Sequence, residues 1–519
     1  MVASPESHIA DMRTMLAKLS AGLPVHHSPE DSLIVPRRDG DVVLVTGTTG
    51  SLGCHLLEAL SLTPTVHRIY ALNRASKDGT PLHVRQKAAL IERAIDARIL
   101  NLQKVVLIEG DLNHPTWGLS EGTFEESLYL HADVPPVAWR VDLVADLDAF
   151  EPVLRGLRRL IDWSLSSPLP IPPRILFVGS CSVLQKAPRD KSIAETVVDI
   201  SAATYSGYSM SKWIAEHLLL AAANASGLDP LIVRVGQLSG GPGGAWAANE
   251  WFPLMVQSAP YLGCFTADPR PVDFLPFDVG AAALVDMLDA SSPTHIAHLV
   301  HPRPTSWNAI AGPIAAALGV ELVPFAEWHA RLEAAPNVRE LRARRLLPWF
   351  RGQALRMSSS PNAMGWPGMD TTYAVRASRT LADPVLRQLG EEDADSVVST
   401  AHNGTGQYSI RVSAYYIILS MIVGLNVICT TRSPCHLHIP YPARPSFVDM
   451  LLFVFVCTER LDVTLLREVG IILGGFTGVT AGRCECVIFD NHDRTLAALE
   501  GTIVCQEPVE VSSIVPPSF

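Results

Sequence analysis

The chain lacks the features that mark several classes of protein. Its 519 residues carry 52 acidic against 41 basic side chains, and this net charge of -11 argues against a nucleic-acid partner, which needs a basic surface. The nine cysteines include no CxxC pair, so neither a bound metal nor a disulfide framework is predicted, and a reducing, cytoplasmic compartment is expected. The N-terminus has no basic segment followed by an apolar one, so no signal peptide is predicted.

Apolar strands alternate with helices over much of the remaining sequence. Hydrophobic residues make up 48% of the chain and charged residues 18%, which allows a large core. The alternation predicts an α/β fold with a doubly wound parallel sheet of the Rossmann type. The expected strands are 42–46, 67–74, 105–112, 174–180 and 230–235, and the expected helical segments are 8–21, 56–60, 84–102, 150–165 and 208–223.

One segment breaks this alternation. A doubly wound sheet needs another buried strand between residues 111 and 150, and the candidate is 127–137. That candidate is short and contains Pro135 and Pro136, which cannot donate hydrogen bonds to a central ladder. We therefore expect this strand either to be built differently or to be shortened.

A glycine-rich turn follows the first strand. Gly47, Gly50 and Gly53 form a GxxGxxG pattern between that strand and a helix. The first glycine allows a tight turn, the second lets a pyrophosphate approach the backbone, and the third lets helix and strand pack closely. Because N–H groups at a helix N-terminus favour anions, the pattern predicts a dinucleotide site. The remaining predicted contacts in this turn are Thr48, Ser51 and Leu52.

Two residues at strand ends bear on the choice of cofactor. Arg74 ends the second expected strand, where an arginine suits the 2′-phosphate of NADPH and an acidic residue would suit NAD. The alternative for Arg74 is an ordinary surface arginine. Asp111 ends the third strand and is either a contact to the adenine edge or an aspartate that closes a turn. We expect NADPH as the cofactor.

Tyr208, Lys212 and Ser180 form the candidate catalytic set. Tyr208 and Lys212 lie one helical turn apart, so the ammonium can stabilise the phenolate and can also bind ribose hydroxyls. Ser180 ends an apolar strand, where its hydroxyl can join Tyr208 in binding an oxyanion. The alternative is a surface Tyr–Lys pair. Downstream of the glycine turn, the three residues predict a nicotinamide-dependent reductase.

These residues resemble an extended short-chain dehydrogenase/reductase. More narrowly, they are similar to the thioester reductase domain of carboxylic acid reductases, aminoadipate reductases and fungal enzymes of the nonribosomal-peptide-synthetase type. The resemblance covers about residues 8–395, and the blocks from residue 234 onward separate it from sugar epimerases. The blocks that carry it are 44–53, 138–142, 150–152, 234–240, 249–253, 301–304 and 306–308.

The resemblance implies a domain organisation and a set of roles. Residues 1–40 would be an N-terminal helix and linker, 41–240 an NADP-binding Rossmann domain, and 241–395 a smaller substrate subdomain. Ser180, Tyr208 and Lys212 would be catalytic, the last two also touching the cofactor with the glycine turn and Arg74. The residues implied near the substrate channel are Gln237 and Trp251, with core packing as the alternative for Trp251.

The resemblance also implies a reaction. Hydride from NADPH would reduce an acyl thioester on a phosphopantetheine carrier or coenzyme A to an aldehyde, and the further step to an alcohol is left open. The family usually has a full apolar strand before the 138–142 block, and here that strand is shortened. The rival hypotheses are therefore a reductase or epimerase of a free small molecule, and a non-catalytic relative that has lost its cofactor site.

The tail at 401–519 lies outside this resemblance. Residues 412–431 form an uncharged run between Arg411 and Arg432, which is long enough to span a bilayer, although a core segment of a second α+β domain is favoured. Residues 482–490 and 495–502 resemble the last strands of a hotdog-fold thioesterase. The tail is otherwise unassigned, and membrane association through it is the alternative to a cytoplasmic location.

Overall fold

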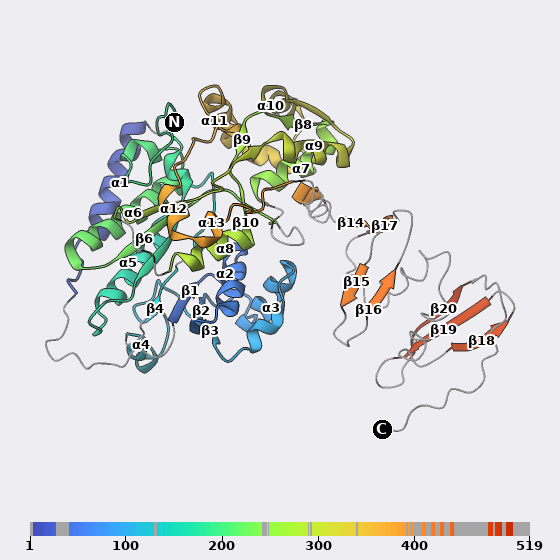
Figure 1. Cartoon of the computed structure of the whole chain (residues 1–519), viewed down its shortest axis with the longest axis horizontal. Helices are drawn as coiled ribbons and strands as arrows, with labels where there is room; N and C mark the ends of the chain where they lie inside the picture. Colours follow the sequence, from blue (N-terminus) through green and yellow to red (C-terminus); the bar gives the residue numbers. More distant parts are fainter. Residues whose placement is uncertain are drawn as a thin grey trace. The chain divides into compact units, whose positions relative to one another are not determined.

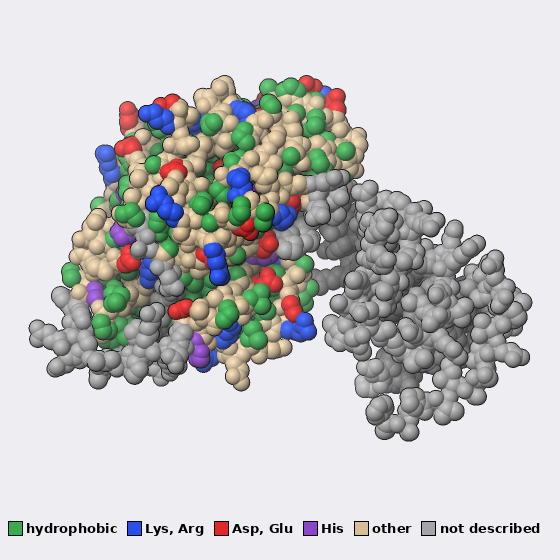
Figure 2. All heavy atoms as spheres, viewed as in Figure 1, with side chains coloured by type: hydrophobic (Ala, Val, Ile, Leu, Met, Phe, Trp, Pro, Cys, Tyr) green, Lys and Arg blue, Asp and Glu red, His purple; other side chains and the backbone are tan. Residues whose placement is uncertain are grey.

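The computed structural model divides the chain into two units, residues 1–405 and 406–519 (Figure 1). In the first unit the structure describes 4–26, 41–128, 132–135, 137–240, 246–247, 249–288, 290, 293–338, 341–390, 393–394 and 397–398. In the second unit it describes only seven strands, from β14 to β20. On the face of the first unit shown in Figure 2, acidic and basic side chains are interspersed among apolar ones.

The first unit is built on a parallel sheet. One set of strands runs in the order β3-β2-β1-β4 and another in the order β11-β6-β5. A parallel bridge between Val134 and Ile175 joins them beside β4, so the full order is β3-β2-β1-β4-β5-β6-β11. This is the strand order of a doubly wound Rossmann sheet, and the predicted fold class is confirmed. The strands are β1 Asp41–Thr46, β2 Val66–Asn73, β3 Val105–Glu109, β4 Ala132–Asp133, β5 Ile175–Ser180, β6 Pro230–Val235 and β11 Ile296–Leu299.

The strand that the sequence left in doubt is the shortest of the seven. β4 pairs with Val42 and Val43 of β1, and helix α4, at Glu121–Ser127, precedes it and includes only the first residue of the 127–137 candidate. Val134 continues the contacts, donating to Arg174 O at 2.8 Å and accepting from Leu176 N at 3.0 Å. The carbonyl of Pro135 accepts from Thr46 N at 3.4 Å, a role that proline can fill because it keeps its acceptor. The strand is shortened, and it still joins the two sides of the sheet.

The two faces of the sheet bury separate cores. Val42 and Leu44 of β1 face a core shared with α1, α5 and α6, whereas Val43 and Val45 face one shared with α2, α3 and α8. This alternation follows from the two-residue period of a strand. The covering helices are α1 Pro5–Ser20, α2 Ser51–Leu62, α3 Leu82–Glu92, α5 Glu151–Leu165, α6 Gly207–Ser226 and α8 Phe277–Asp286.

The prediction of a single helix over 84–102 is wrong in its extent. α3 ends at Glu92, and a separate 3-10 helix covers Ala97–Asn101. Ala94 between them has φ of 56°, in the left-handed region that interrupts a right-handed helix.

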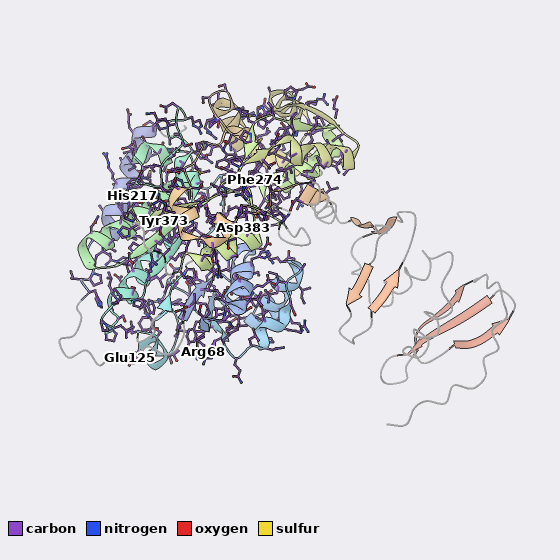
Figure 3. The ribbon with its side chains drawn as sticks, viewed as in Figure 1. Arg68, Glu125, His217, Phe274, Tyr373 and Asp383 are labelled. Atoms are coloured by element: carbon purple, nitrogen blue, oxygen red, sulfur yellow. The ribbon has the colours of Figure 1, made fainter. Side chains whose placement is uncertain are left out.

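A smaller part of the first unit is interleaved with the sheet. Within residues 241–395, α8 and β11 return to the Rossmann layer, whereas β8 and β13 pair in parallel and carry further helices. Its core contains aromatic rings, including Phe274, which is labelled in Figure 3 and packs edge-on to Trp251 and Trp307. The remaining elements of the first unit are α4 Glu121–Ser127, β7 Leu238–Ser239, α7 Trp251–Leu262, β8 Cys264–Ala267, β9 Pro271–Val272, β10 Leu275–Pro276, β12 Thr305–Ser306, α9 Asn308–Leu318, β13 Glu321–Pro324, α10 Phe325–Ala334, α11 Leu347–Met357, α12 Thr372–Ala377 and α13 Arg379–Ala382.

In the second unit the structure describes two pairs of antiparallel strands and one group of three. Part of the uncharged run at 412–431 lies outside the described residues, and its described parts, β15 and β16, pair with each other. Among the residues that the structure describes, no helix is long and apolar enough to cross a membrane. The likeness of 482–502 to a hotdog fold stays a prediction. The strands are β14 Gln407–Arg411, β15 Ile417–Ser420, β16 Asn426–Cys429, β17 His436–Pro440, β18 Phe476–Thr480, β19 Arg483–Phe489 and β20 Thr495–Gly501.

A buried ion pair joins α6 to β6. Arg234 and Glu216 both have fully buried side chains, and two guanidinium nitrogens bind the carboxylate at 2.8 and 3.0 Å. Arg234 also donates to the carbonyl of Thr196 at 2.9 Å and to His298 Nε2 at 3.3 Å. His298 Nδ1 lies 2.8 Å from the carbonyl of Asp370, so Nδ1 carries the proton and Nε2 accepts. Burial, with the Arg234 charge beside it, lowers the pKa of His298 to about 3, which keeps the ring neutral.

A second buried carboxylate connects the sheet to α12. Glu195 accepts backbone hydrogen bonds from His298 at 2.9 Å, from Tyr373 at 2.5 Å and from Ala374 at 3.0 Å (Tyr373 is labelled in Figure 3). The last two are N–H groups in the first turn of α12, where an anion is stabilised. The helix that carries Tyr208 and Lys212 is therefore fixed to β6, and β11 beside β6 is fixed to α12.

Replacing Glu216 with glutamine leaves the Arg234 charge buried without its counter-ion. We expect E216Q to lose about 3–5 kcal/mol of unfolding free energy, measured by urea denaturation. The matched control is E151Q, because the Glu151–Lys18 pair is partly exposed and its loss costs about 1 kcal/mol or less. Equal losses in the two variants would contradict the importance of the buried pair.

Candidate functional site

The glycine turn between β1 and α2 has a backbone that only glycine fits. Gly47 has φ of +75°, and a Cβ there would lie 2.8 Å from the Cα of Ala138. A Cβ on Gly53 would lie 2.1 Å from the carbonyl oxygen of Gly47. Gly50 is the N-cap of α2 and supplies no side-chain cap, so the first N–H groups of the helix have no side-chain acceptor from it. The turn has the geometry that the sequence predicts for a pyrophosphate site.

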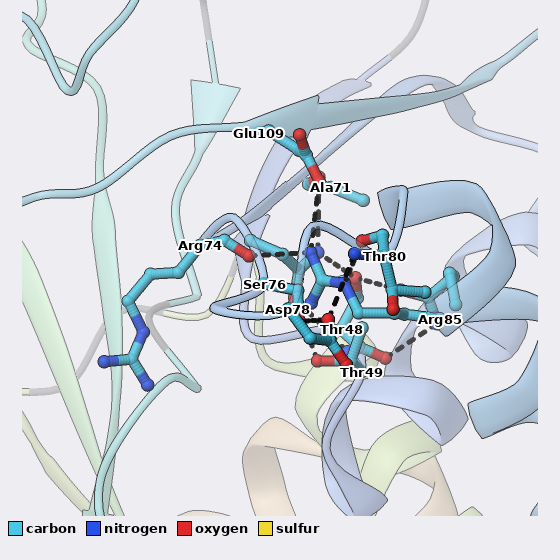
Figure 4. A network of polar contacts seen from close by, with 11 residues as sticks. Thr48, Thr49, Ala71, Arg74, Ser76, Asp78, Thr80, Arg85 and Glu109 are labelled. Carbon is cyan, nitrogen blue, oxygen red and sulfur yellow. Dashed lines mark hydrogen bonds and ion pairs between the residues drawn. The ribbon is translucent and has the colours of Figure 1, made fainter.

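Thr48 fixes the turn from inside. Its hydroxyl donates to Gln86 Oε1 at 2.6 Å and accepts from Asn73 Nδ2 at 2.7 Å, and its carbonyl accepts from Gln86 Nε2 at 2.9 Å. The side chain is fully buried, so the cofactor contact predicted for Thr48 is limited to its backbone. Leu52 is likewise a core side chain. Figure 4 shows this polar network, in which Thr49 also binds Asn73 Oδ1 at 3.3 Å.

Arg74 lies directly after β2 with an exposed side chain. Figure 4 shows its guanidinium pointing away from the Thr48 network, and it forms no ion pair with a residue that the structure describes. Its neighbour Arg85 is engaged, binding the carbonyl of Arg74 at 2.7 Å and Glu109 at 3.2 Å. Arg74 is therefore a cation without an ion-pair partner among the described residues, and it lies beside the adenosine end of the predicted site.

Asp111 closes a turn. Its carboxylate accepts from the backbone and side-chain nitrogens of Asn113 at 2.9 and 3.0 Å. Burial raises the pKa of Asp111, but the hydrogen bonds from Asn113 and the charge of Arg74 outweigh burial, and the pKa is lowered. These contacts favour the turn role over an adenine contact.

The three candidate catalytic residues converge at the carboxyl edge of the sheet. Ser180 ends β5, and Tyr208 and Lys212 lie in the first two turns of α6, which packs against β5. Burial raises the pKa of Tyr208 to about 12, although a hydrogen bond with Ser180 opposes that shift. The phenol is thus protonated near neutral pH and can act as a donor.

Lys212 is buried beneath an aromatic ring. Its ammonium donates to the carbonyl of Val178 at 2.8 Å and lies 4.2 Å from the ring centroid of Trp139 and 5.9 Å from that of Tyr208. Burial lowers the pKa of Lys212 to about 7, and the nearby Glu216 carboxylate opposes this only in part. Trp139 follows the shortened β4, and nothing in the local pattern around it predicts that it covers the lysine.

The two residues expected near the substrate channel bind each other. Trp251 Nε1 donates to Gln237 Oε1 at 2.6 Å, and Gln237 Nε2 lies 3.4 Å from Glu250 Oε2. The ring of Trp251 is 6% exposed and packs among Phe252, Phe274 and other aromatic rings, so core packing is its main role. Gln237 follows β6 and is half-buried. Its partner Glu250 was not among the residues predicted for the site.

A polar cavity of about 290 Å³ lies close to the end of β5. Asp273, His301 and Asn362 are among its lining residues, and Asn362 Nδ2 lies 3.4 Å from the Asp273 carboxylate. Burial raises the pKa of Asp273 to about 7, and its charge contributes to the raised pKa of Cys181, which follows Ser180. Neither Ser180 nor the helix of Tyr208 lines this cavity.

Similar known proteins form a coherent group. Residues 45–284 match the family described as Male sterility protein. The adenylate-forming reductase Nps10 of Heterobasidion annosum is 39% identical over 397 residues, which are 74% of this chain and 36% of that protein. The adenylate-forming reductase Nps9 of Serpula lacrymans is 35% identical over 413 residues, which are 74% of this chain and 37% of that protein. The chain therefore spans little more than a third of the length of these relatives.

A solved structure agrees in fold. The terminal R domain from the myxalamid PKS-NRPS biosynthetic pathway superposes with a TM-score of 0.60 and 21% identity, covering 77% of this chain and 98% of that domain. The resemblance inferred from the sequence is confirmed: residues 45–284 match the Male sterility protein family model, and the chain is similar to adenylate-forming reductases. A nicotinamide dinucleotide as cofactor is thereby supported, and the preference for NADPH stays a prediction.

The buried position of Lys212 has a measurable consequence for stability. Its pKa is about 7 in the folded chain against 10.5 for a free lysine, so between these values the unfolded state binds more protons and stability rises with pH. We expect the unfolding free energy of wild type, relative to that of K212M, to rise by up to about 1.4 kcal/mol per pH unit above pH 7. Urea unfolding at several pH values measures this difference.

The exposed Lys191 provides the control, because the difference between wild type and K191M should stay constant over the same range. A difference between wild type and K212M that does not change with pH would contradict the lowered pKa of the buried Lys212.

Proposed function

We propose that this chain is an NADPH-dependent reductase that converts an acyl thioester, on a phosphopantetheine carrier or coenzyme A, into an aldehyde and a free thiol. The observation that carries the proposal is the convergence of Ser180 at the end of β5 with Tyr208 and the buried Lys212 on α6, where the Lys212 ammonium lies 5.9 Å from the Tyr208 ring. The relation to adenylate-forming reductases supports the thioester substrate.

Each candidate catalytic side chain has a separate role in reduction of the carbonyl group. The cofactor, when bound, supplies the hydride. Ser180 and Tyr208 donate hydrogen bonds to the carbonyl oxygen and stabilise the charge that develops on it. Because the phenol of Tyr208 is protonated in the resting site, it can also give its proton to that oxygen. Lys212 uses one N–H on Val178, which leaves two for Tyr208 or for a ribose hydroxyl.

The shortened β4 motivates the rival hypothesis of a relative without a cofactor site. Against that rival, the chain after β4 still reaches the turn: Ala138 N donates to Thr46 Oγ1 at 3.2 Å, and Ala138 packs directly on Gly47. The shortened strand therefore still leads the chain into contact with the glycine turn. Direct binding of NADPH, followed by fluorescence, would decide between the two, and absent binding would favour the rival.

The phenol of Tyr208 tests the reaction class. We expect Y208F to lower the rate of aldehyde formation from an acyl-pantetheine thioester by about 100-fold or more, because a general acid and oxyanion donor is lost. Affinity for NADPH should change little. The product is measured as a trapped aldehyde adduct, and a free ketone of similar size serves as the comparison substrate. Near-normal turnover in Y208F, or preference for the ketone, would contradict the proposal.

Arg74 tests the choice of cofactor. Removing its guanidinium in R74A should weaken NADPH binding by about 10-fold to 100-fold, the worth of a hydrogen bond to a charged group, and leave NADH binding unchanged. The control is R68A, since Arg68 is a partly exposed arginine near the start of the same strand, where it binds the carbonyl of Gln103 at 2.9 Å (Figure 3). Equal affinity of wild type and R74A for NADPH, by fluorescence titration, would assign Arg74 to the surface.

A further inference from the structure

Glu250 is an acidic residue at the N-cap position of α7. Short side chains such as Asp, Asn or Ser often accept from N–H groups of the first turn at this position. The longer Glu250 side chain makes no such bond. It turns instead to Trp246, whose indole N–H donates to Oε2 at 2.8 Å, and to the amide of Gln237 at 3.4 Å. Contacts outside the helix therefore set the orientation of this carboxyl.

The surroundings of Glu250 favour a carboxyl that keeps its proton. Both donors are neutral, and the carboxyl forms no ion pair with any residue in the described part of the chain. Burial raises the pKa of Glu250 to about 7, although the hydrogen bonds from Trp246 and Gln237 oppose the shift. A proton donor and acceptor of this kind, near neutral pH, is suited to acid–base chemistry.

The geometry of the sheet brings Glu250 to the reacting centre. Ser180 is the register partner of Val235 on the neighbouring parallel strand, and Gln237 follows two residues later. The Gln237–Glu250 contact thus lies beside the Ser180–Tyr208 pair at the same edge. The charge of Glu250 contributes to the raised pKa of Tyr208, which places the two groups within electrostatic reach.

Reduction of a thioester to an aldehyde consumes one proton, which ends on sulfur, because any proton that Tyr208 gives to the oxygen returns to Tyr208 when the carbonyl re-forms. The carbonyl oxygen is served by Tyr208, but the sulfur of the departing thiol needs its own donor. Resting on the proposed function, we propose that Glu250 is the catalytic acid for the leaving thiol, with Gln237 and Trp246 as positioning residues. The sequence predicted Tyr208 as the proton donor of this site, and the proposal adds Glu250 as a second one.

Hydride transfer leaves a tetrahedral adduct at the substrate carbon, and this adduct then collapses. The electron pair on oxygen re-forms the carbonyl double bond, and the carbon–sulfur bond breaks with its pair going to sulfur. Sulfur takes the proton of the Glu250 carboxyl, which becomes a carboxylate and regains a proton from solvent before the next turnover. The products are an aldehyde and a neutral thiol.

The test compares two leaving groups on one acyl chain: a pantetheine thioester, whose alkyl thiolate is basic, and a thiophenyl ester, whose aryl thiolate leaves without a proton. We expect E250Q to slow aldehyde formation from the pantetheine ester by about 100-fold, and to leave the rate with the thiophenyl ester within about threefold. Y208F should slow both esters alike, because the carbonyl oxygen is common to them.

Two further variants distinguish the loss of a proton donor from a general disturbance of the structure. W246F removes one hydrogen bond to Glu250 and should give the same selective loss, smaller in size. E58Q removes another half-buried carboxyl with a raised pKa, on α2, and should change neither rate. If E250Q and W246F slow both esters by the same factor, or neither, the inference is overturned. If wild type forms no aldehyde from either ester, the proposed function itself fails.

Discussion

The buried contact between Arg234 and Glu216 is the constraint on which the site depends. Glu216 lies one helical turn after Lys212 on α6, and Arg234 extends from the strand next to the one that ends at Ser180. The pair therefore fixes the height and rotation of α6 against the sheet. An error of 1 Å in that placement would separate the phenol from the serine hydroxyl, since hydrogen bonds weaken steeply beyond their normal length.

Burial then determines the chemistry of the site. Three groups around the end of β5 have their pKa values moved toward or away from neutrality by desolvation: Lys212 falls to about 7, Glu250 rises to about 7 and Tyr208 rises to about 12. In water these groups would be a cation, an anion and a weak acid. In this site Lys212 and Glu250 can exchange protons near pH 7, whereas Tyr208 stays protonated and can donate a hydrogen bond.

The parts that the sequence predicts are those encoded within a few residues. The GxxGxxG turn, the strand-end Ser180 and the Tyr208–Lys212 spacing each depend on local backbone geometry, and the structure has the turn and brings the three side chains together. The alternation of strands and helices likewise predicted the doubly wound parallel sheet. The extent of α3 was wrong because one alanine, Ala94, adopts a left-handed conformation that its residue type does not predict.

The parts that the sequence misses depend on contacts between distant segments. Trp139 lies over Lys212 although 73 positions separate them along the chain (212 minus 139). Glu250 has no local sequence signal of its own, and its bonds to Trp246 and Gln237 join segments that only the fold brings together. A tryptophan such as Trp251 gives no local sign of whether it packs in the core or lines a channel, and the structure favours the core.

In the proposed reaction, hydride goes from the cofactor to the carbonyl carbon of a thioester. A direct test incubates the protein with NADPH deuterated at the transferable position and an acyl-pantetheine thioester, and measures the trapped aldehyde by mass spectrometry. We expect one deuterium on the aldehyde carbon and one free thiol for each NADPH consumed. Release of the thiol with unlabelled carboxylic acid, or consumption of neither substrate, would contradict it.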